Sequence, residues 1–316
     1  MLSSRQYIVS HAPFWHNGTA VHHRNYNWLL ALLPAVAAGL TYFGVPALGV
    51  ICLAVSSAIF WEWLITTVAR RPVTVGDGNA ALVGLIFGLL LPATAPWWLV
   101  ITGTFIAILI GQQVFGGIGG NPFNPAALAW AIIFLSWKTF LDFDSMLVNY
   151  SFNFAPYHPL VALKAFGPQA VARIPLGDLF LGKQVGGIGT TCGLALVLGG
   201  IWLMARGIVR WEIPLSFLAG VFVSAFIFHV AAPESFSGPL FHIMAGYTLF
   251  GAFFLAPEDS SSPVNFLPML IYGATGGIMT ILIRNIGAYP DGVIFAILVI
   301  NLINPLIDKI RPKRVN

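Results

Sequence analysis

Residues 111–127 read Gly-Gln-Gln-Val-Phe-Gly-Gly-Ile-Gly-Gly-Asn-Pro-Phe-Asn-Pro-Ala-Ala, a polar, glycine-dense segment between two hydrophobic runs. Irregular backbone is tolerated at membrane depth only where protein surrounds it or where it lines a cavity, because hydrocarbon offers no hydrogen-bond partners. Glycines such as Gly117 and Gly119 allow tight turns or a close approach to a ligand. Asn121 and Asn124 carry amides that could hydrogen-bond that ligand. The segment predicts either a binding site or a plain connection between two broken helices.

The composition is that of a membrane protein. Hydrophobic residues make up 58% of the 316 residues and charged residues 8%, and the mean hydropathy is +0.84. Soluble domains carry roughly 25% charged residues. The net charge of +4 therefore does not indicate a nucleic-acid partner; the lipid bilayer is the surrounding that the composition predicts.

Ten hydrophobic segments predict an all-α polytopic membrane protein. A full span needs about 20 apolar residues, so the shorter third and fourth segments are expected to be tilted spans or broken half-helices. Interrupted segments in corresponding places of two five-segment halves suggest an inverted repeat with a site between the halves. The segments are 27–44, 46–69, 80–94, 97–111, 125–141, 188–205, 214–231, 239–256, 265–285 and 292–307.

Five parts of the chain follow from this pattern. They are an N-terminal segment (1–26), a first membrane half (27–141), an outer loop (142–187), a second membrane half (188–307) and a basic tail (308–316). With the N-terminus inside, ten Lys and Arg residues fall on the inner side and five on the outer side. Positive charge favours the cytoplasmic side, so both termini are expected in the cytoplasm and 142–187 in the periplasm of a bacterial inner membrane.

Familiar catalytic and metal-binding patterns are absent from the sequence, so no catalytic residue is predicted and any metal remains unknown. Asp77 precedes a hydrophobic run and is expected to cap the start of a helix. Glu258 and Asp259 end the eighth segment on the inner side and are expected to be solvated loop carboxylates. Gly177 to Lys183 has the glycine and lysine spacing of a phosphate loop. Gln184 then stands at the position of its metal-binding hydroxyl, which argues against that role.

Several motifs in a fixed order carry a resemblance to a known family. The most specific is 115–126, Phe-Gly-Gly-Ile-Gly-Gly-Asn-Pro-Phe-Asn-Pro-Ala. The others are 77–80 with 91–92 and 96–98, then 188–189, 272–273, 284–296, Asn301 and 305–308. Together they make the chain similar, over nearly its whole length, to the family of membrane electron-transfer proteins that contains RnfD of the Rnf complex and NqrB of the Nqr complex. Its short N-terminus is more similar to the RnfD type.

The resemblance implies a ten-span subunit of a multisubunit, ion-pumping oxidoreductase, which would not be a catalyst on its own. Its expected partners are other membrane subunits, a periplasmic haem or flavin protein, and a quinone. Family members carry an FMN esterified to a threonine of the outer loop and are thought to hold a non-covalent riboflavin in the membrane part. Asn121 and Asn124, with Gly117 and Gly119, are the positions that match the second flavin.

The outer loop departs from the family at the covalent flavin. Residues 153–164 read Asn-Phe-Ala-Pro-Tyr-His-Pro-Leu-Val-Ala-Leu-Lys. Pro159 and Leu160 align with the family's Pro-Leu, which places His158 at the flavin-bearing threonine. A phosphoester needs a hydroxyl, and imidazole supplies none. Covalent FMN is therefore expected to be absent, while riboflavin or another non-covalent flavin is expected to remain.

Three functional hypotheses follow. In the first, the chain is an electron-transfer subunit that kept the membrane flavin and lost the covalent FMN, with a partner's haem or flavin acting at the outer face. In the second, it is a redox-silent membrane scaffold of a related complex. In the third, the same plan serves a small-solute channel or transporter. Bound flavin separates the first from the other two, and solute flux without redox partners favours the third.

Overall fold

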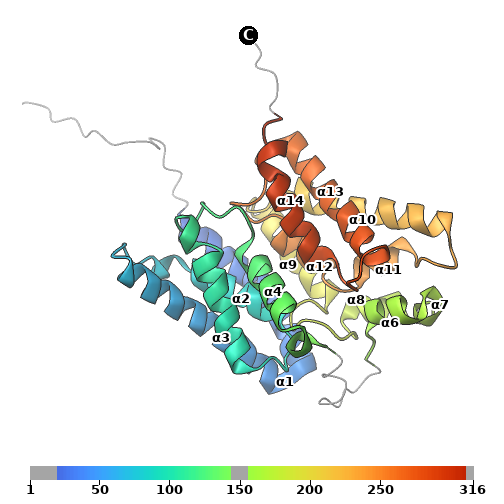
Figure 1. Ribbon diagram of the computed structural model, residues 1–316, viewed down its shortest axis with the longest axis horizontal. Helices are drawn as coiled ribbons and strands as arrows, with labels where there is room; N and C mark the ends of the chain where they lie inside the picture. Colours follow the sequence, from blue (N-terminus) through green and yellow to red (C-terminus); the bar gives the residue numbers. More distant parts are fainter. Residues whose placement is uncertain (1–19, 144–155, 311–316) are drawn as a thin grey trace, which may run out of the picture.

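The computed structural model describes residues 20–143 and 156–310, and helices dominate these ranges (Figure 1). Within them the only strand-like pairing is an isolated bridge between Tyr157 and Gln184. The prediction of an all-α polytopic membrane protein is confirmed. The remaining parts of the predicted N-terminal segment, outer loop and basic tail lie outside the described residues.

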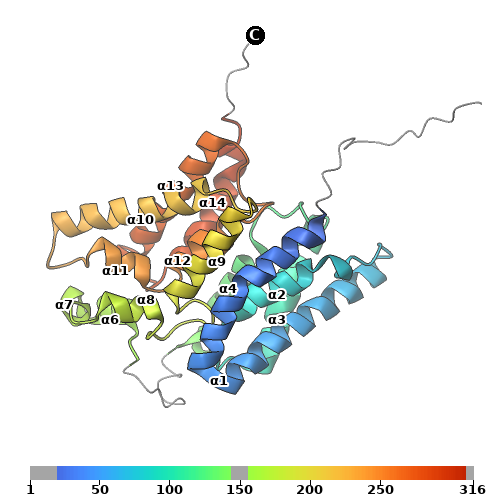
Figure 2. The ribbon, with the colours of Figure 1, turned by 180° about the vertical axis from the view of Figure 1, so that it is seen from behind.

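The first helix, α1 (Val21–Val68), contains two of the predicted spans. Gly44 has φ 64° and ψ −149° and folds the helix back on itself (Figure 2). This backbone conformation is open to glycine and costly for other residues. The arms 21–43 and 45–68 are each about 35 Å long at 1.5 Å per residue, enough to cross a hydrocarbon core of about 30 Å.

The third and fourth segments resolve into a half-helix and a full span. The third segment contains α2 (Asn79–Leu90), and the fifth contains α4 (Pro125–Ser136). Each helix has 12 residues, and its length of about 18 Å is too short to cross the bilayer. α3 (Trp97–Phe105) instead continues through a π-helical turn, Ile106–Ile110. With the 3₁₀ turn Gln113–Phe115 it forms an apolar stretch of 19 residues, which is long enough to span.

The outer loop and the second half complete the fold, and each of the ten predicted segments overlaps a helix. The outer loop contains α6 (Pro159–Phe166), α7 (Pro168–Val171) and α8 (Leu176–Leu181). The second half consists of α9 (Gly193–Ala205), α10 (Glu212–Ala231), α11 (Pro239–Met244), α12 (Thr248–Phe250) with the π-helical turn Gly251–Leu255, α13 (Phe266–Asn285) and α14 (Val293–Ile307). The inverted repeat stays a prediction.

Residues predicted to share one side of the membrane meet at one end of the molecule. Arg24 forms an ion pair with Asp259 and donates to the carbonyl oxygen of Ile208 at 3.1 Å. We call this the inner end. At the opposite, outer end, Lys164 of α6 donates to the carbonyl oxygen of Arg284 at 3.2 Å. These contacts agree with the predicted grouping of the loops, whereas the absolute orientation stays a prediction.

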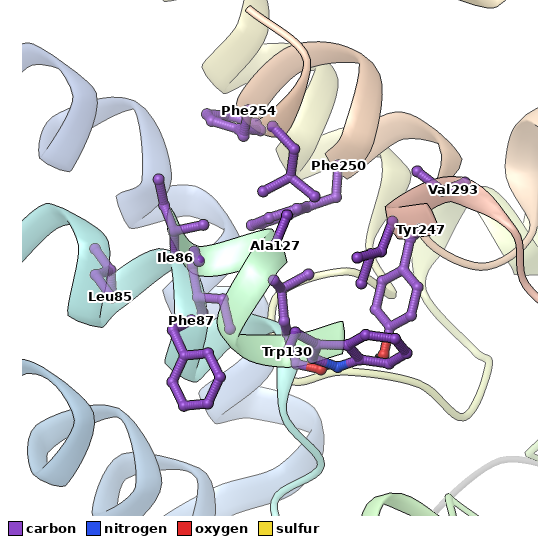
Figure 3. Packing of buried hydrophobic residues seen from close by; sticks show 14 of the residues in the cluster. Leu85, Ile86, Phe87, Ala127, Trp130, Tyr247, Phe250, Phe254 and Val293 are labelled. Carbon is purple, nitrogen blue, oxygen red and sulfur yellow. Dashed lines mark hydrogen bonds between the residues drawn. The ribbon is translucent and has the colours of Figure 1, made fainter. Parts of the chain in front are cut away.

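An apolar core joins the two halves between the inner and outer ends (Figure 3). Ala127 and Trp130 of α4 face Tyr247, Phe250 and Phe254 of the second half. The rings of Trp130 and Tyr247 lie edge to face with their centroids 5.6 Å apart. Ala127 and Phe250 are fully buried. Because lipid is as apolar as this core, close packing rather than hydrophobic transfer holds the halves together.

Candidate functional site

Two cavities lie between the membrane halves, one at each end. The outer cavity has a volume of about 490 Å³ and the inner cavity about 180 Å³. They share no lining residue. Ala127 and Phe250 lie between Phe254, which lines the inner cavity, and Trp130, which lines the outer one (Figure 3). The two cavities are therefore separate sites with an apolar layer between them.

The inner cavity is polar on one wall and aromatic on the other. Its aromatic wall comes from Trp28 of α1 and Phe254 of the second π-helical turn. The polar wall comes from α1, α2, the 111–125 turn and the 258–260 loop; it includes Arg24, Asn25, Asn79, Gln112, Asn124, Glu258 and Asp259. Asn79 donates to Gln112 Oε1 at 3.1 Å, which joins the start of α2 to the turn.

The predicted glycine turn lies beside this cavity at the inner end. Gly116, Gly117 and Gly119 have φ of 107°, 100° and 88°, a region that strongly favours glycine. No atom lies within 4 Å of the position that a Cβ would take at any of the three. Gly116 and Gly119 are exposed. The turn therefore leaves open backbone next to the cavity and does not pack solidly against the protein.

Asn124 has a structural role in this geometry. Its Oδ1 accepts from the backbone N–H of Ala127 at 3.0 Å and so caps α4. Its Nδ2 donates to the carbonyl oxygen of Leu255 at 3.1 Å, across the two halves. When the Asn301 side-chain amide is oriented with its oxygen toward Asn124, the backbone N–H of Asn124 also donates to that oxygen at 3.0 Å. Both polar atoms of the Asn124 amide therefore have partners within the protein, which agrees with the prediction of a plain connection between two helices.

Asn121 differs because one of its polar atoms has no partner. The side chain is 1% exposed, and its Nδ2 donates to the carbonyl oxygen of Phe123 and to Glu258 Oε1. Its Oδ1 is buried and accepts no hydrogen bond from the described residues. A buried acceptor without a donor costs roughly 1–3 kcal/mol. The turn that carries Asn121 lies beside the inner cavity, although Asn121 itself is not one of its lining residues.

The expectation that Glu258 and Asp259 are solvated is right only in part: Asp259 is exposed, but both acids also have partners in the protein. Glu258 is half-buried and accepts from Asn121 and from the backbone N–H of Ser261 at 2.9 Å. Asp259 pairs with Arg24. Burial raises the pKa of Asp259 to about 6, although the Arg24 guanidinium opposes this rise. Nothing in the sequence around these acids indicated which part of the other half they would meet.

Asp77 has the capping role expected from its position. Its Oδ1 accepts from the backbone N–H of Asn79 at 2.8 Å, at the start of α2. Its own carbonyl oxygen accepts from Asn25 at 2.9 Å, so α1 and α2 are joined at the inner end. The carboxylate is therefore part of the frame of the inner cavity and not a separate reactive site.

The outer cavity has a buried floor and an open mouth. Trp130, Leu160, Val185, Thr190 and Tyr247 form the floor, and each is buried. The mouth is lined by exposed or partly exposed residues that include Lys138, Thr139, Asp142, His158 and Asp291. His158 precedes α6, and its ring lies edge to face with Phe143 at 6.1 Å between centroids. The residue at the predicted flavin-attachment position thus lines this cavity.

Arg284 organises the rim of the outer cavity and was not predicted. Its side chain is 1% exposed and pairs with Asp291 at 2.9 Å. It also donates to the carbonyl oxygens of His242 and Ala245 and to the hydroxyl of Thr248. These contacts hold the break between α11 and α12 in place. One feature of the sequence could have indicated this role: Arg284 lies at the end of the hydrophobic segment 265–285, seven residues before Asp291.

Gln184, which argued against a phosphate loop, holds another part of the same rim. The residue is 4% exposed, and its Nε2 donates to the carbonyl oxygens of Leu179, Thr191 and Met244 at 3.0–3.2 Å. Its neighbours Val185 and Gly186 line the outer cavity. Lys183, the lysine of the supposed motif, pairs with Asp178 at 2.9 Å. The segment therefore positions the cavity wall.

A metal centre is not visible in the described part of the chain. Within residues 20–143 and 156–310, no three His, Cys, Asp or Glu side chains are grouped so that they could hold a metal ion. Cys52 and Cys192 are both free thiols.

Comparison with known proteins identifies the family. A family model described as the NQR2, RnfD, RnfE family matches residues 8–316. The D subunit of the ion-translocating oxidoreductase complex of Yersinia enterocolitica is 33% identical over 341 residues, covering 97% of each chain. The corresponding D subunits of Escherichia fergusonii and Escherichia coli K12 are each 32% identical over 335 residues, covering 95% of both chains. The resemblance seen in the sequence motifs is confirmed, and the chain belongs to the NQR2, RnfD, RnfE family.

Proposed function

We propose that this chain is the D-type membrane subunit of an ion-translocating oxidoreductase complex and carries electrons within it. The observation that carries this proposal is the similarity to the D subunits of such complexes along 95–97% of both chains. The all-helical, multi-pass fold agrees with that role. Other membrane subunits of such a complex are its partners, and the bacterial inner membrane, with both termini in the cytoplasm, is its location.

A non-covalent flavin at the inner end is the second part of the proposal. The unpaired Oδ1 of Asn121, the open backbone at Gly117 and Gly119, and the aromatic wall of the inner cavity suit the edge of an isoalloxazine ring. Ligand sites that enclose a whole cofactor usually exceed about 300 Å³. At about 180 Å³, the cavity fits part of the molecule, and the rest would lie over the exposed turn.

Riboflavin fits this inner site better than FMN. Glu258 and Asp259 place two carboxylates beside the cavity, and the one cation among its lining residues, Arg24, is already paired with Asp259. A phosphate there would meet like charges and find no unpaired cation to neutralise it. A bound flavin supplies one- and two-electron chemistry. The chain's own residues would orient the ring through Asn121 and exclude water through the aromatic wall.

Covalent FMN does not fit the outer end. His158 lines the outer cavity at the position matched to the family's threonine, and its ring has no hydroxyl for a phosphoester. We therefore propose that this chain transfers electrons without a covalent flavin. A periplasmic haem or flavin protein would take over at the outer face, and a quinone is a further candidate partner.

The alternatives of a scaffold and a solute channel have less support. A scaffold needs no open glycine turn beside a cavity with an aromatic wall, yet this chain has both. An open solute channel needs a continuous path, but the inner and outer cavities share no lining residue, and the fully buried Ala127 and Phe250 lie between them. A transporter that opens to one side at a time stays as the alternative. Electron transfer crosses such an apolar layer without a pore.

The experiment that tests the subunit assignment is purification of the tagged chain from its native membrane in mild detergent. We expect further membrane subunits to co-purify, and deletion of the chain to abolish electron transfer through the complex in isolated membranes. A chain that purifies alone, from membranes whose electron transfer is unchanged by its deletion, would contradict the proposal.

A further inference from the structure

We infer that the corner between α9 and α10, residues 202–211, is a binding site for one anionic phospholipid of the surrounding bilayer. Phosphatidylglycerol represents this class of ligand. The corner shares no residue with the lining of the inner or the outer cavity, and no flavin takes part. The inference therefore stands apart from the proposed function.

The corner lies at the inner end and is flanked by exposed aromatic rings. The carbonyl oxygen of Ile208 accepts from Arg24 at 3.1 Å, which fixes the corner against the start of α1. Trp211 meets Phe266, at the start of α13, edge to face with 6.3 Å between centroids. Both rings and that of Trp202 are exposed. Exposed aromatic rings at one end of a membrane protein are typical of the level of the lipid headgroups.

The Arg206 side chain folds back along α9 instead of extending away from the helix. Arg206 follows the last residue of α9, and its guanidinium carbon lies 5.7 Å from the ring centroid of Trp202, one turn earlier. Because α9 runs from the outer loop to the inner end, Trp202 lies on the bilayer side of Arg206. The attraction between a guanidinium and the face of an indole ring holds the cation in this position.

Arg206 is the cation of this corner that is left for a ligand. No carboxylate among the residues that the structure describes pairs with its guanidinium, whereas Arg210 pairs with the buried Glu212 at 2.7 Å. The next residue, Gly207, has φ 67° and no atom within 4 Å of the position that a Cβ would take. Space therefore remains beside the guanidinium, which can bind two phosphate oxygens at once.

An exposed apolar stripe on α9 leads away from this cation toward the outer end. Leu194, Leu198 and Ile201 are 41–54% exposed and recur at the spacing of one helix face, and Trp202 continues the stripe to Arg206. An acyl chain along the stripe would bring its phosphate to the guanidinium. A free phosphate would use the cation alone, so the stripe favours a lipid as the source of the anion.

A lipid also suits the corner better than an acidic partner subunit does. Phosphates of anionic lipids already lie at headgroup level in the bilayer, and basic positions at the ends of membrane spans attract them. A carboxylate on a partner's span would have to leave water to reach the same position, which is costly. The partner remains a distinct outcome of the experiment.

The test is lipid binding to the purified full-length chain in detergent, measured by native mass spectrometry. Phosphatidylglycerol, phosphatidylcholine with the same acyl chains, and inorganic phosphate are added separately. We expect one phosphatidylglycerol to bind more tightly than phosphatidylcholine, and inorganic phosphate not to bind. Arg206→Gln should weaken phosphatidylglycerol binding by about five-fold, the contribution of one cation near an anionic headgroup, and leave phosphatidylcholine binding unchanged.

Two further variants separate a built site from positive charge in general. Trp202→Leu keeps the stripe apolar and should weaken phosphatidylglycerol binding by a smaller factor, because the guanidinium loses its ring. Arg71→Gln is the matched control, since Arg71 is also an exposed arginine at the inner end but has no ring contact among the described residues. It should leave phosphatidylglycerol binding unchanged. Arg206→Gln and Arg71→Gln should both keep the melting temperature of the unaltered chain, because both side chains are exposed.

The inference is overturned if both lipids bind equally, if Arg206→Gln and Arg71→Gln have equal effects, or if inorganic phosphate binds as tightly as phosphatidylglycerol. Loss of a co-purifying subunit from the Arg206→Gln variant, with lipid binding unchanged, would also overturn it and assign the corner to a partner. None of these results bears on the flavin content of the chain or on electron transfer in membranes, which test the proposed function.

Discussion

Asn121 and Glu258 hydrogen-bond across the two membrane halves, with 3.2 Å between Asn121 Nδ2 and Glu258 Oε1. The contact fixes the glycine turn of the first half against the loop that follows the second π-helical turn. It also orients the Asn121 amide so that Oδ1 is left without a donor. One side chain therefore joins the halves and presents the acceptor that we assign to a flavin.

The two asparagines of the turn should respond differently to replacement by alanine. Asn121→Ala should lower the amount of flavin that co-purifies while the chain still inserts, because it removes the unpaired acceptor. Asn124→Ala should cost about 1–2 kcal/mol of stability, since it removes the cap of α4, and lower flavin occupancy as a consequence. Flavin content per chain and the melting temperature in detergent measure the two effects.

Asn304→Ala is the control, because Asn304 donates to the carbonyl oxygen of Ser261 and also has a buried amide oxygen without a partner, but lies outside the glycine turn. It should keep the flavin. Full flavin retention in the Asn121 variant would remove this residue from the site.

The buried pair of Arg284 and Asp291 predicts a large effect on stability. Arg284→Gln leaves the Asp291 carboxylate without its cation, and breaking a buried pair in this way costs about 3–5 kcal/mol. The double variant Arg284→Gln, Asp291→Asn should be less destabilised than Arg284→Gln alone, because no unpaired charge remains. Thermal unfolding of the unaltered chain, of Arg284→Gln, of Asp291→Asn and of the double variant measures the coupling. Equal melting temperatures for the single and double variants would show that charge pairing is not the cause.

Asp259 predicts a pH dependence of stability. Its pKa is about 6 in the folded chain against an ordinary value of 3.8, so between these values the folded state binds more protons than the unfolded state. The free energy of unfolding should therefore fall as the pH rises from about 4 to about 6. Asp259→Asn should flatten this part of the curve. The exposed Glu234→Gln variant should leave it unchanged, and an identical slope in both variants would refute the assignment.

The orientation rests on the ten-against-five distribution of Lys and Arg. A reporter fused after Asn316 should act in the cytoplasm, and one inserted within 142–187 should act in the periplasm. Activity of a periplasmic reporter at the C-terminus would contradict this orientation.

Hydropathy and glycine placement predicted much of the fold because spans and tight turns are local properties. The ten segments match helices, and Gly44 makes the turn between the first two. The predicted segment 125–141 shows that the ends of helices were predicted less well, because its helix ends at Ser136 and a 3₁₀ turn follows (Lys138–Leu141). The π-helical turns also escaped notice, since their hydrophobic composition equals that of an α-helix.

The candidate sites were predicted less completely because they depend on contacts between distant residues. Glu258 meets Asn121 across 137 positions, and Lys164 meets Arg284 across 120. Arg284 was counted among the outer charges and begins the family motif 284–296, but neither observation predicted that its side chain is buried. The position of His158 followed from the family motif, yet the cavity that it lines is assembled from both halves and the outer loop. No pattern within one segment carries that information.

The most direct test of the account is the visible absorption spectrum of the purified chain before and after denaturation, followed by a gel scanned for flavin fluorescence. We predict a flavin spectrum that leaves the protein completely on denaturation and no fluorescent band at the mass of the chain. His158→Thr alone should give no band either, because family members carry Ser/Asp-Gly-Ala directly before the threonine, and this chain has Ala-Pro-Tyr at 155–157 instead. A fluorescent band on the unaltered chain, or a chain purified without any flavin, would contradict the account.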